Sequence, residues 1–419
     1  MAREPIAGMV ENAVPTQLDP EDLAAEVELE LPGSQETMAF EGMDIEIVPE
    51  DDGGVVIDFD PQDQRGQNDD FYANLAEEMP DRELGRIASE LLGEFDANKA
   101  SRQEWEDAYA NGLELLGFSY EERTQPFRGA TGVTHPLLAE AATQFQAQAF
   151  NELLPASGPV RTAIIGSETR EKQQQSDRVR QFMNYYITNV MEEYTPELDQ
   201  MLFYLPLAGS TFKKIYYDET MDRAVSKFVP VEQLVVPYET SDLETCPNIT
   251  QVLRMPLNDL RKKQVAGFYL DMDVLPAQSD LGTVTSEIER IDGVSPSQID
   301  YDCTLLECHV DLDLEGYEDK DEEGEPTGIK VPYVVTISQD NGQILSIRRN
   351  YREDDENKKK IQYFVHYKFL PGFGFYGLGL IHTIGGLSRT ATAALRQLID
   401  AGTLSNLPAG FKARGLRIR

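Results

Sequence analysis

The clearest hydrophobic pattern in the chain lies between residues 380 and 401. Apolar residues recur there at three- and four-residue spacing, which predicts an amphipathic helix about 30 Å long. The apolar stripe consists of Ile384, Leu387, Ala391, Ala394 and Leu398. Arg389 and Arg396 are seven residues apart and fall on the opposite face of this helix, and Gly402 is a natural C-terminal stop. We expect its many small residues to let a neighbouring helix approach closely.

A glycine-aromatic turn precedes this helix. Gly372, Gly374 and Gly377 have the spacing of a dinucleotide-binding fingerprint. Aromatic rings fill the gaps between the glycines, however, and the acidic partner of the ribose would fall inside the helix instead of at the end of a second strand. We therefore expect a tight turn with aromatic side chains packed at the helix base. A nucleotide-binding enzyme that uses this turn is the alternative interpretation.

The region from residue 81 to residue 300 is mainly helical in its pattern. Apolar spacing predicts two helices over 81–118, a helix capped by Thr134 that runs to about Leu154, a helical stretch over 168–200 and a further helix opened by Pro196. Strand-like alternation follows on both sides of a turn at Asp218 and Glu219. Residues 257–274 predict another helix, and residues 275–300 predict a linker rich in Ser, Asp and Pro.

Four strand-like runs between residues 302 and 369 predict an antiparallel meander. Asn341 and Gly342 form a strong hairpin signal between the second and third runs. With this region, the chain is predicted to belong to the α+β class.

Two sets of residues in the meander have the composition of metal sites. Asp311, Asp313, Glu315, Gly316 and Glu322 have the spacing of a calcium-binding loop. Strands flank them, where the calcium-binding motif requires helices. Cys303, Cys308 and His309 lie on one strand at separations that point to opposite faces. The four histidines of the chain have no acid or thiol partner in sequence. We expect no metal, no cofactor and no catalytic residue.

The charge of the chain restricts its partners. The sequence has 37 Lys and Arg residues against 74 Asp and Glu residues, a net charge of −37. This acidity opposes tight binding to a phosphate backbone but would suit a wall along which DNA slides. Residues 1–80 have only Arg3 and Arg65 as basic residues and predict an acidic arm, either disordered or ordered on a partner. Three cysteines form no disulfide framework, and no signal peptide or membrane span is expected.

Four segments carry a family resemblance through their order along the chain. They are SGPVRT, LAGSTFKKIYYD, VPVEQLVVPYETSDLETCPNITQVLRM and residues 371–418. In this order they resemble the portal, or head-to-tail connector, proteins of short-tailed bacteriophages, over roughly residues 80–419. The resemblance implies a virion protein at a capsid vertex and a ring of about twelve subunits around a DNA channel. It also implies a helical and β wing, a stem of long helices and an antiparallel β clip.

The resemblance assigns a part to each region. These parts are an acidic arm (1–80), the wing (81–255), the first stem helix and a linker (256–300), the clip or a wing sheet (301–370), the second stem helix (371–402) and the start of a returning wing (403–419). Members of the family continue beyond that point, so we expect the chain to be truncated. Arg389 and Arg396 would face the channel or a neighbouring subunit, although solvated arginines are an equally good interpretation.

The resemblance also implies partners instead of a reaction. The implied partners are double-stranded DNA bound without sequence specificity, the terminase motor, a tail adaptor, the capsid and a scaffolding protein. We expect no enzymatic activity and no membrane association. A third interpretation, beside the portal and the enzyme, is an acidic scaffold or adaptor protein without a channel.

Overall fold

The computed structural model describes residues 71–118, 122–218, 221–274, 282–293, 302–320 and 325–406, together with two short strands before them. The chain divides into two compact units, residues 1–70 and residues 71–419. In the first unit, strands β1 (Glu46–Pro49) and β2 (Val55–Asp58) pair in antiparallel fashion. The rest of the predicted acidic arm up to residue 70 lies outside the described residues. All further structure belongs to the second unit.

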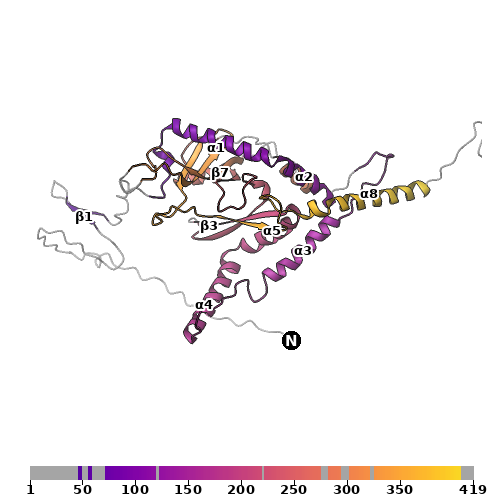
Figure 1. Cartoon of the computed structure of the whole chain (residues 1–419), viewed down its shortest axis with the longest axis horizontal. Coiled ribbons are helices and arrows are strands. Elements are labelled where there is room, and N and C mark those ends of the chain that lie inside the picture. The colour runs from indigo at the N-terminus through magenta and orange to yellow at the C-terminus, as the bar shows by residue number, and fades with distance from the viewer. Residues whose placement is uncertain are drawn as a thin grey trace, which may run out of the picture. The chain divides into compact units, whose positions relative to one another are not determined.

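The helices of the second unit largely follow the predicted pattern (Figure 1). They are α1 (Asp81–Ser101), α2 (Gln103–Leu113), α3 (Leu137–Leu153), α4 (Arg170–Tyr185), α5 (Tyr194–Ala208), α6 (Leu257–Val265), α7 (Gly282–Asp292) and α8 (Leu380–Asn406). Pro136, and not Thr134, is the residue that precedes α3. The predicted stop at Gly402 is also wrong, because Gly402 stays in the helix and α8 continues to Asn406. None of the described helices combines the length and apolar content that a bilayer crossing requires.

Two helices differ from the prediction between residues 257 and 300. Helix α6 ends at Val265, because Gly267 takes a left-handed φ of 70° and Leu270 then pairs with the backbone of Leu345. The predicted linker contains helix α7, whose Val284 is buried and whose Ile288 packs against the same core. The helix expected over 257–274 is therefore wrong in its extent, and the linker is wrong in part.

A three-stranded antiparallel sheet has the order β10-β3-β4. Its strands are β3 (Ser210–Asp218), β4 (Arg223–Val229) and β10 (Phe364–Lys368). Asp218 lies opposite Arg223, which confirms the predicted hairpin. The edge strand β10 is the fourth run of the predicted meander, so that run pairs with β3 and not with its predecessor in sequence.

A five-stranded antiparallel sheet has the order β5-β6-β7-β8-β9. Its strands are β5 (Leu234–Val235), β6 (Asn248–Pro256), β7 (Asp302–Leu312), β8 (Val331–Ser338) and β9 (Ile344–Arg349). Strands β7, β8 and β9 confirm the first three runs of the meander, with Gly342 at a φ of 65° in the hairpin. Strand β6 pairs with β7, so this sheet takes strands from both sides of residues 256–300.

A buried ionic cluster joins the two large sheets. Lys214 Nζ of β3 lies 2.5 Å from Glu307 Oε1 of β7, and His309 Nε2 lies 2.7 Å from the same oxygen. Burial opposes ionisation of Glu307, but the Lys214 ammonium and the His309 hydrogen bond outweigh it and hold the pKa of Glu307 well below its usual range. The cluster fixes one sheet against the other, and the fold as a whole is α+β.

Candidate interaction surface on helix α8

The base of α8 is held by direct backbone packing. A Cβ atom on Gly379 would lie 2.1 Å from Leu207 O, and a Cβ on Gly377 would lie 2.3 Å from Gly209 O. Gly377 N also donates to Ser210 Oγ at 2.7 Å. The backbone of the glycine turn is thus covered by the end of α5 and the start of β3. No open cradle for a phosphate exists at these glycines, whereas a dinucleotide fingerprint needs exposed backbone amides.

The other two glycines and the aromatic residues of the turn complete the packing at the helix base. Gly372 leaves no room for a side chain beside Tyr376 O, whereas a Cβ atom on Gly374 would make only an ordinary contact with the ring of Tyr238, at 3.4 Å. Phe375 and Tyr376 are buried, as the predicted aromatic plug requires. Phe373 is fully exposed, so the plug contains two rings and not three.

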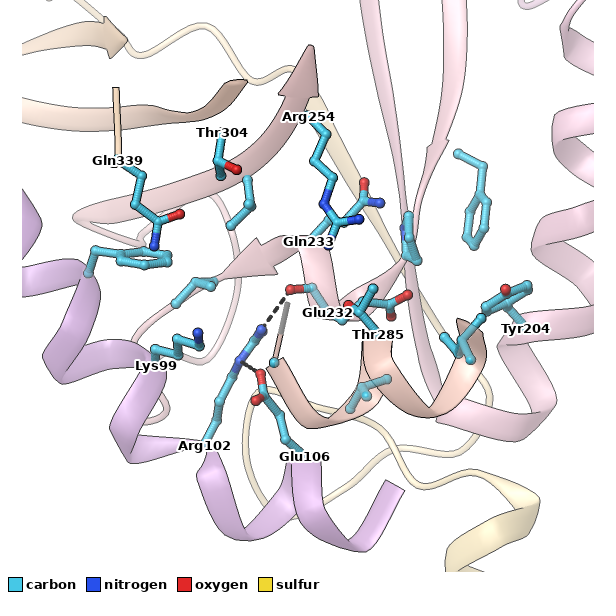
Figure 2. Close-up of a pocket in the computed structure, with 18 of the residues that line it drawn as sticks. Lys99, Arg102, Glu106, Tyr204, Glu232, Gln233, Arg254, Thr285, Thr304 and Gln339 are labelled. Carbon is cyan, nitrogen blue, oxygen red and sulfur yellow. Dashed lines mark hydrogen bonds and ion pairs between the residues drawn. The ribbon is translucent and has the colours of Figure 1, made fainter. Parts of the chain in front are cut away.

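One buried arginine connects this plug to the rest of the molecule. Arg102, at the junction of α1 and α2, has only 1% of its surface exposed. Its Nη1 atom donates to Leu234 O at 2.6 Å and to the Tyr376 hydroxyl at 3.0 Å, and its Nη2 atom donates to Glu232 O at 2.9 Å. Nε lies 2.6 Å from Glu106 Oε1. Arg102 thereby ties α2, the segment before β5 and the base of α8 into one unit, and Figure 2 shows its contacts with Glu106 and Glu232.

A cavity of about 410 Å³ lies beside Arg102, lined by residues of α1, α2, α5 and α7. Figure 2 shows Lys99, Arg254 and Gln339 around it with Glu232. Glu232 Oε2 is buried without a hydrogen-bond partner among the described residues. Burial raises the pKa of Glu232 to about 7. Since lysine and arginine side chains and carboxylates line the cavity together, it has no net preference for one sign of charge.

The face of α8 that contacts its own chain is polar beyond the first two turns. Asp400 Oδ1 accepts from Thr131 N at 2.8 Å, and Thr392 Oγ1 accepts from His135 N at 3.0 Å. Arg396 Nε donates to Val133 O at 2.8 Å. Ser388 is buried on the same face. This helix therefore holds the extended segment 131–135 by hydrogen bonds, with little apolar packing.

The predicted apolar stripe of α8 turns away from the chain. Only its first member, Ile384, packs against the core, and Ala391 is half-buried. Leu387 is 63% exposed, Leu398 is 72% exposed and Ala394 is also exposed. The helix is thus amphipathic in the reverse sense for a surface helix, with polar residues inward and large apolar residues outward. We call Leu387, Ala394 and Leu398 the α8 outer face.

The two predicted arginines lie away from the α8 outer face but have different surroundings. Arg396 is half-buried against the carbonyls of segment 131–135, whereas Arg389 is exposed. Both line an open cleft of about 800 Å³ with Arg123 and Arg290. Glu114 and Asp400 also line this cleft. Their placement in a channel or at a subunit contact remains a prediction.

The histidine and cysteine side chains have structural surroundings. The expectation that no histidine has an acid partner is wrong for His309, because residues two apart on a strand share a face and His309 Nε2 lies 2.7 Å from Glu307 Oε1. His366 Nε2 lies 3.0 Å from Ser210 Oγ, but Ser210 is fully buried beneath the glycine turn. All three cysteines are buried, and they form no disulfide with one another. Cys303 and Cys308 belong to different core clusters, as their opposite faces on the strand predict. Within the described residues, no group of three or more His, Cys, Asp or Glu side chains is placed to hold a metal ion.

Several residues of this surface were not among the sequence candidates. Ser388, Thr392 and Asp400 form the polar inner face, and their spacing of four and eight residues is a visible signal of a shared face. For Arg102 the sequence shows only the pairing with Glu106 four residues later, because its other hydrogen-bond acceptors lie in segments more than a hundred residues away.

Comparison with known proteins adds no relative. No protein-family model matches the chain, and no curated protein matches it.

Proposed function

We propose that this protein is a portal subunit, which assembles into a ring at one capsid vertex and surrounds a channel for DNA. The observation that carries the proposal is the reversed polarity of α8. The polar side chains on its inner face hydrogen-bond to segment 131–135. The α8 outer face exposes Leu387 and Leu398 in one row. A single exposed leucine is ordinary on a protein surface, but an apolar row along a helix is typical of an interface.

A second copy of the chain is the occupant that suits this row best. Helices that stand side by side around an axis need an apolar edge and small residues for close approach. Ala391 and Ala394 supply the small residues between Leu387 and Leu398. In a closed ring, the same contact repeats at every subunit boundary, so a modest contact is multiplied by the symmetry.

The charge of the chain supports a conduit in preference to a tight DNA binder. At −37 per subunit, a ring would repel the phosphate backbone along most of its surface. In this proposal the DNA passes without sequence readout, and a separate terminase motor supplies the energy for packaging. The other partners are the tail adaptor, the capsid and the scaffolding protein, and the location is the virion.

The two alternatives make different demands on the molecule. A nucleotide-binding enzyme would need open backbone along the glycine turn, but protein atoms already fill the space at Gly372 and Gly377. An acidic scaffold or adaptor protein would need no hole through its assembly.

Imaging of the purified protein by negative-stain electron microscopy tests the proposal. The expected result is a population of annular particles with a central hole. Solid particles, or monomers at all protein and salt concentrations tried, would contradict the portal function.

A further inference from the structure

Helix α4 carries a second exposed apolar face. No side chain of this helix is buried, and Phe182 is 61% exposed. Val179 and Met183 lie beside Phe182 on the same side of the helix and are also exposed. We call Val179, Phe182 and Met183 the α4 outer face. Its residues at positions i, i+3 and i+4 form one apolar ridge of the kind that packs into the groove of another helix.

The opposite side of α4 repeats the arrangement found on α8. Asn184 Oδ1 accepts from Val160 N at 2.8 Å, and Asn184 Nδ2 donates to Val160 O at 3.2 Å. Ser176 Oγ donates to Thr162 Oγ1 at 2.8 Å. Helix α4 therefore also holds an extended segment of its own chain with polar side chains and leaves its apolar ridge uncovered. Two helices of one chain share this reversed polarity.

We propose that the α4 outer face of one copy receives the α8 outer face of a neighbouring copy. The inference rests on the proposed ring, because a ring is built from heterologous contacts, in which each subunit uses two different patches. One patch alone would pair with itself and stop at a dimer. The α4 outer face and the α8 outer face would supply the two different patches that a heterologous contact requires.

The α4 outer face is short enough to lie along the α8 outer face. It extends from Val179 to Met183, a rise of about 6 Å, within a helix of 16 residues. The α8 outer face extends from Leu387 to Leu398, a rise of about 16 Å. Figure 1 shows α4 and α8 leaving the body of the second unit in different directions, so the two helices of one copy do not cover each other. A contact between them therefore requires two molecules.

Cysteine cross-linking in the intact protein tests this contact. The three native cysteines are buried, so cysteines introduced at Phe182 and Leu398 become the reactive thiols of the described surface. A bismaleimide with a reach of about two helical turns, roughly 11 Å, tolerates a shift in helix register. The Phe182→Cys/Leu398→Cys protein should give a ladder of covalent multimers. A mixture of the two single variants should stop at the covalent dimer.

The controls separate this inference from the proposed ring. The pair Val265→Cys/Leu398→Cys should give no ladder, because Val265 is 79% exposed but lies on α6, away from both faces. Particles of ring mass without a ladder from the 182–398 pair would overturn the α4–α8 contact and leave the ring intact. Covalent dimers of the single Leu398→Cys variant would also overturn it, because they would show that α8 pairs with itself. An absence of large particles would reject the ring and the contact together.

A charge substitution provides an independent measurement that needs no cross-link. Phe182→Asp and Leu398→Asp should each raise the protein concentration at half-assembly by tenfold or more. If Phe182 and Leu398 contact each other, each substitution alone already removes the shared contact. The fold-increase in the half-assembly concentration of the double variant should then be smaller than the product of the two single fold-increases. Fully multiplicative effects would overturn the pairing of these faces.

Discussion

Replacement of Arg102 by methionine tests how the base of α8 is held. Methionine replaces the aliphatic stem of the side chain with apolar atoms but removes the charge and every donor. Glu106 would lose the guanidinium 2.6 Å from its carboxylate, and the carbonyls of Glu232 and Leu234 would lose donors at 2.9 and 2.6 Å. The Tyr376 hydroxyl would lose its contact as well.

The expected loss of stability is large for a single substitution. Removal of one partner of a buried ion pair costs about 3–5 kcal/mol, because the remaining charge stays buried without compensation. Each orphaned buried carbonyl adds about 1 kcal/mol or more. We therefore expect Arg102→Met to lower the free energy of unfolding by at least about 3 kcal/mol, against a total of about 5–15 kcal/mol for a typical domain.

The molecule contains its own probe for this measurement. Trp105 is the single tryptophan of the chain and stacks on Tyr376 with ring centroids 4.9 Å apart. Urea unfolding followed by tryptophan fluorescence thus reports on the base of α8 directly. The matched control is Arg86→Met on α1, where the side chain is 55% exposed and pairs with Glu83 on the surface. That substitution should cost no more than about 1 kcal/mol.

A double substitution separates the charge from the packing. Arg102→Met/Glu106→Leu removes both members of the pair and leaves no buried carboxylate at that position. The double variant should lose about 1–3 kcal/mol less unfolding free energy than the sum of the losses of the two single variants. If Arg102→Met costs no more than Arg86→Met, the assignment of Arg102 as the anchor of α8 is wrong.

Three further substitutions test the packing and the pH dependence. Gly379→Ala should lower stability by about 2 kcal/mol or more in urea unfolding, because its Cβ would lie 2.1 Å from Leu207 O. Gly386→Ala, with nothing within 4 Å, should raise stability by about 0.5–1 kcal/mol, and the reverse order of the two variants would contradict the packing. Glu232 binds its proton more tightly when folded, with a pKa of about 7 against 4.5, so stability should fall as pH rises through this window. Glu232→Gln should therefore be more stable than wild type at pH 8, by at most about 3 kcal/mol, and similar near pH 4; a less stable variant at pH 8 would contradict the burial of Glu232.

The sequence predicted where most helices lie better than it predicted what they pack against. The three- and four-residue spacing of apolar residues identified the stripe of α8. That spacing does not show whether the stripe faces the core of its own chain or another molecule. Helix α7 was missed because Gly282, Thr285 and Ser286 resemble a linker, although Val284, Ile288 and Ile291 have helical spacing. The pairing of β10 with β3 crosses about 150 residues, and no local pattern of alternation specifies such a partner.

The position of the α8 outer face in the assembled protein is the central claim. The mass of the particles in solution, measured for wild type and for Leu398→Asp, tests it most directly. Leu398 is 72% exposed in the single chain, so burial against a neighbour would contribute about 1–2 kcal/mol at each contact. Wild type and the control Val265→Asp should form one large species of the same mass, and Leu398→Asp should shift towards the single subunit. Equal masses for wild type and Leu398→Asp at every concentration would contradict the claim.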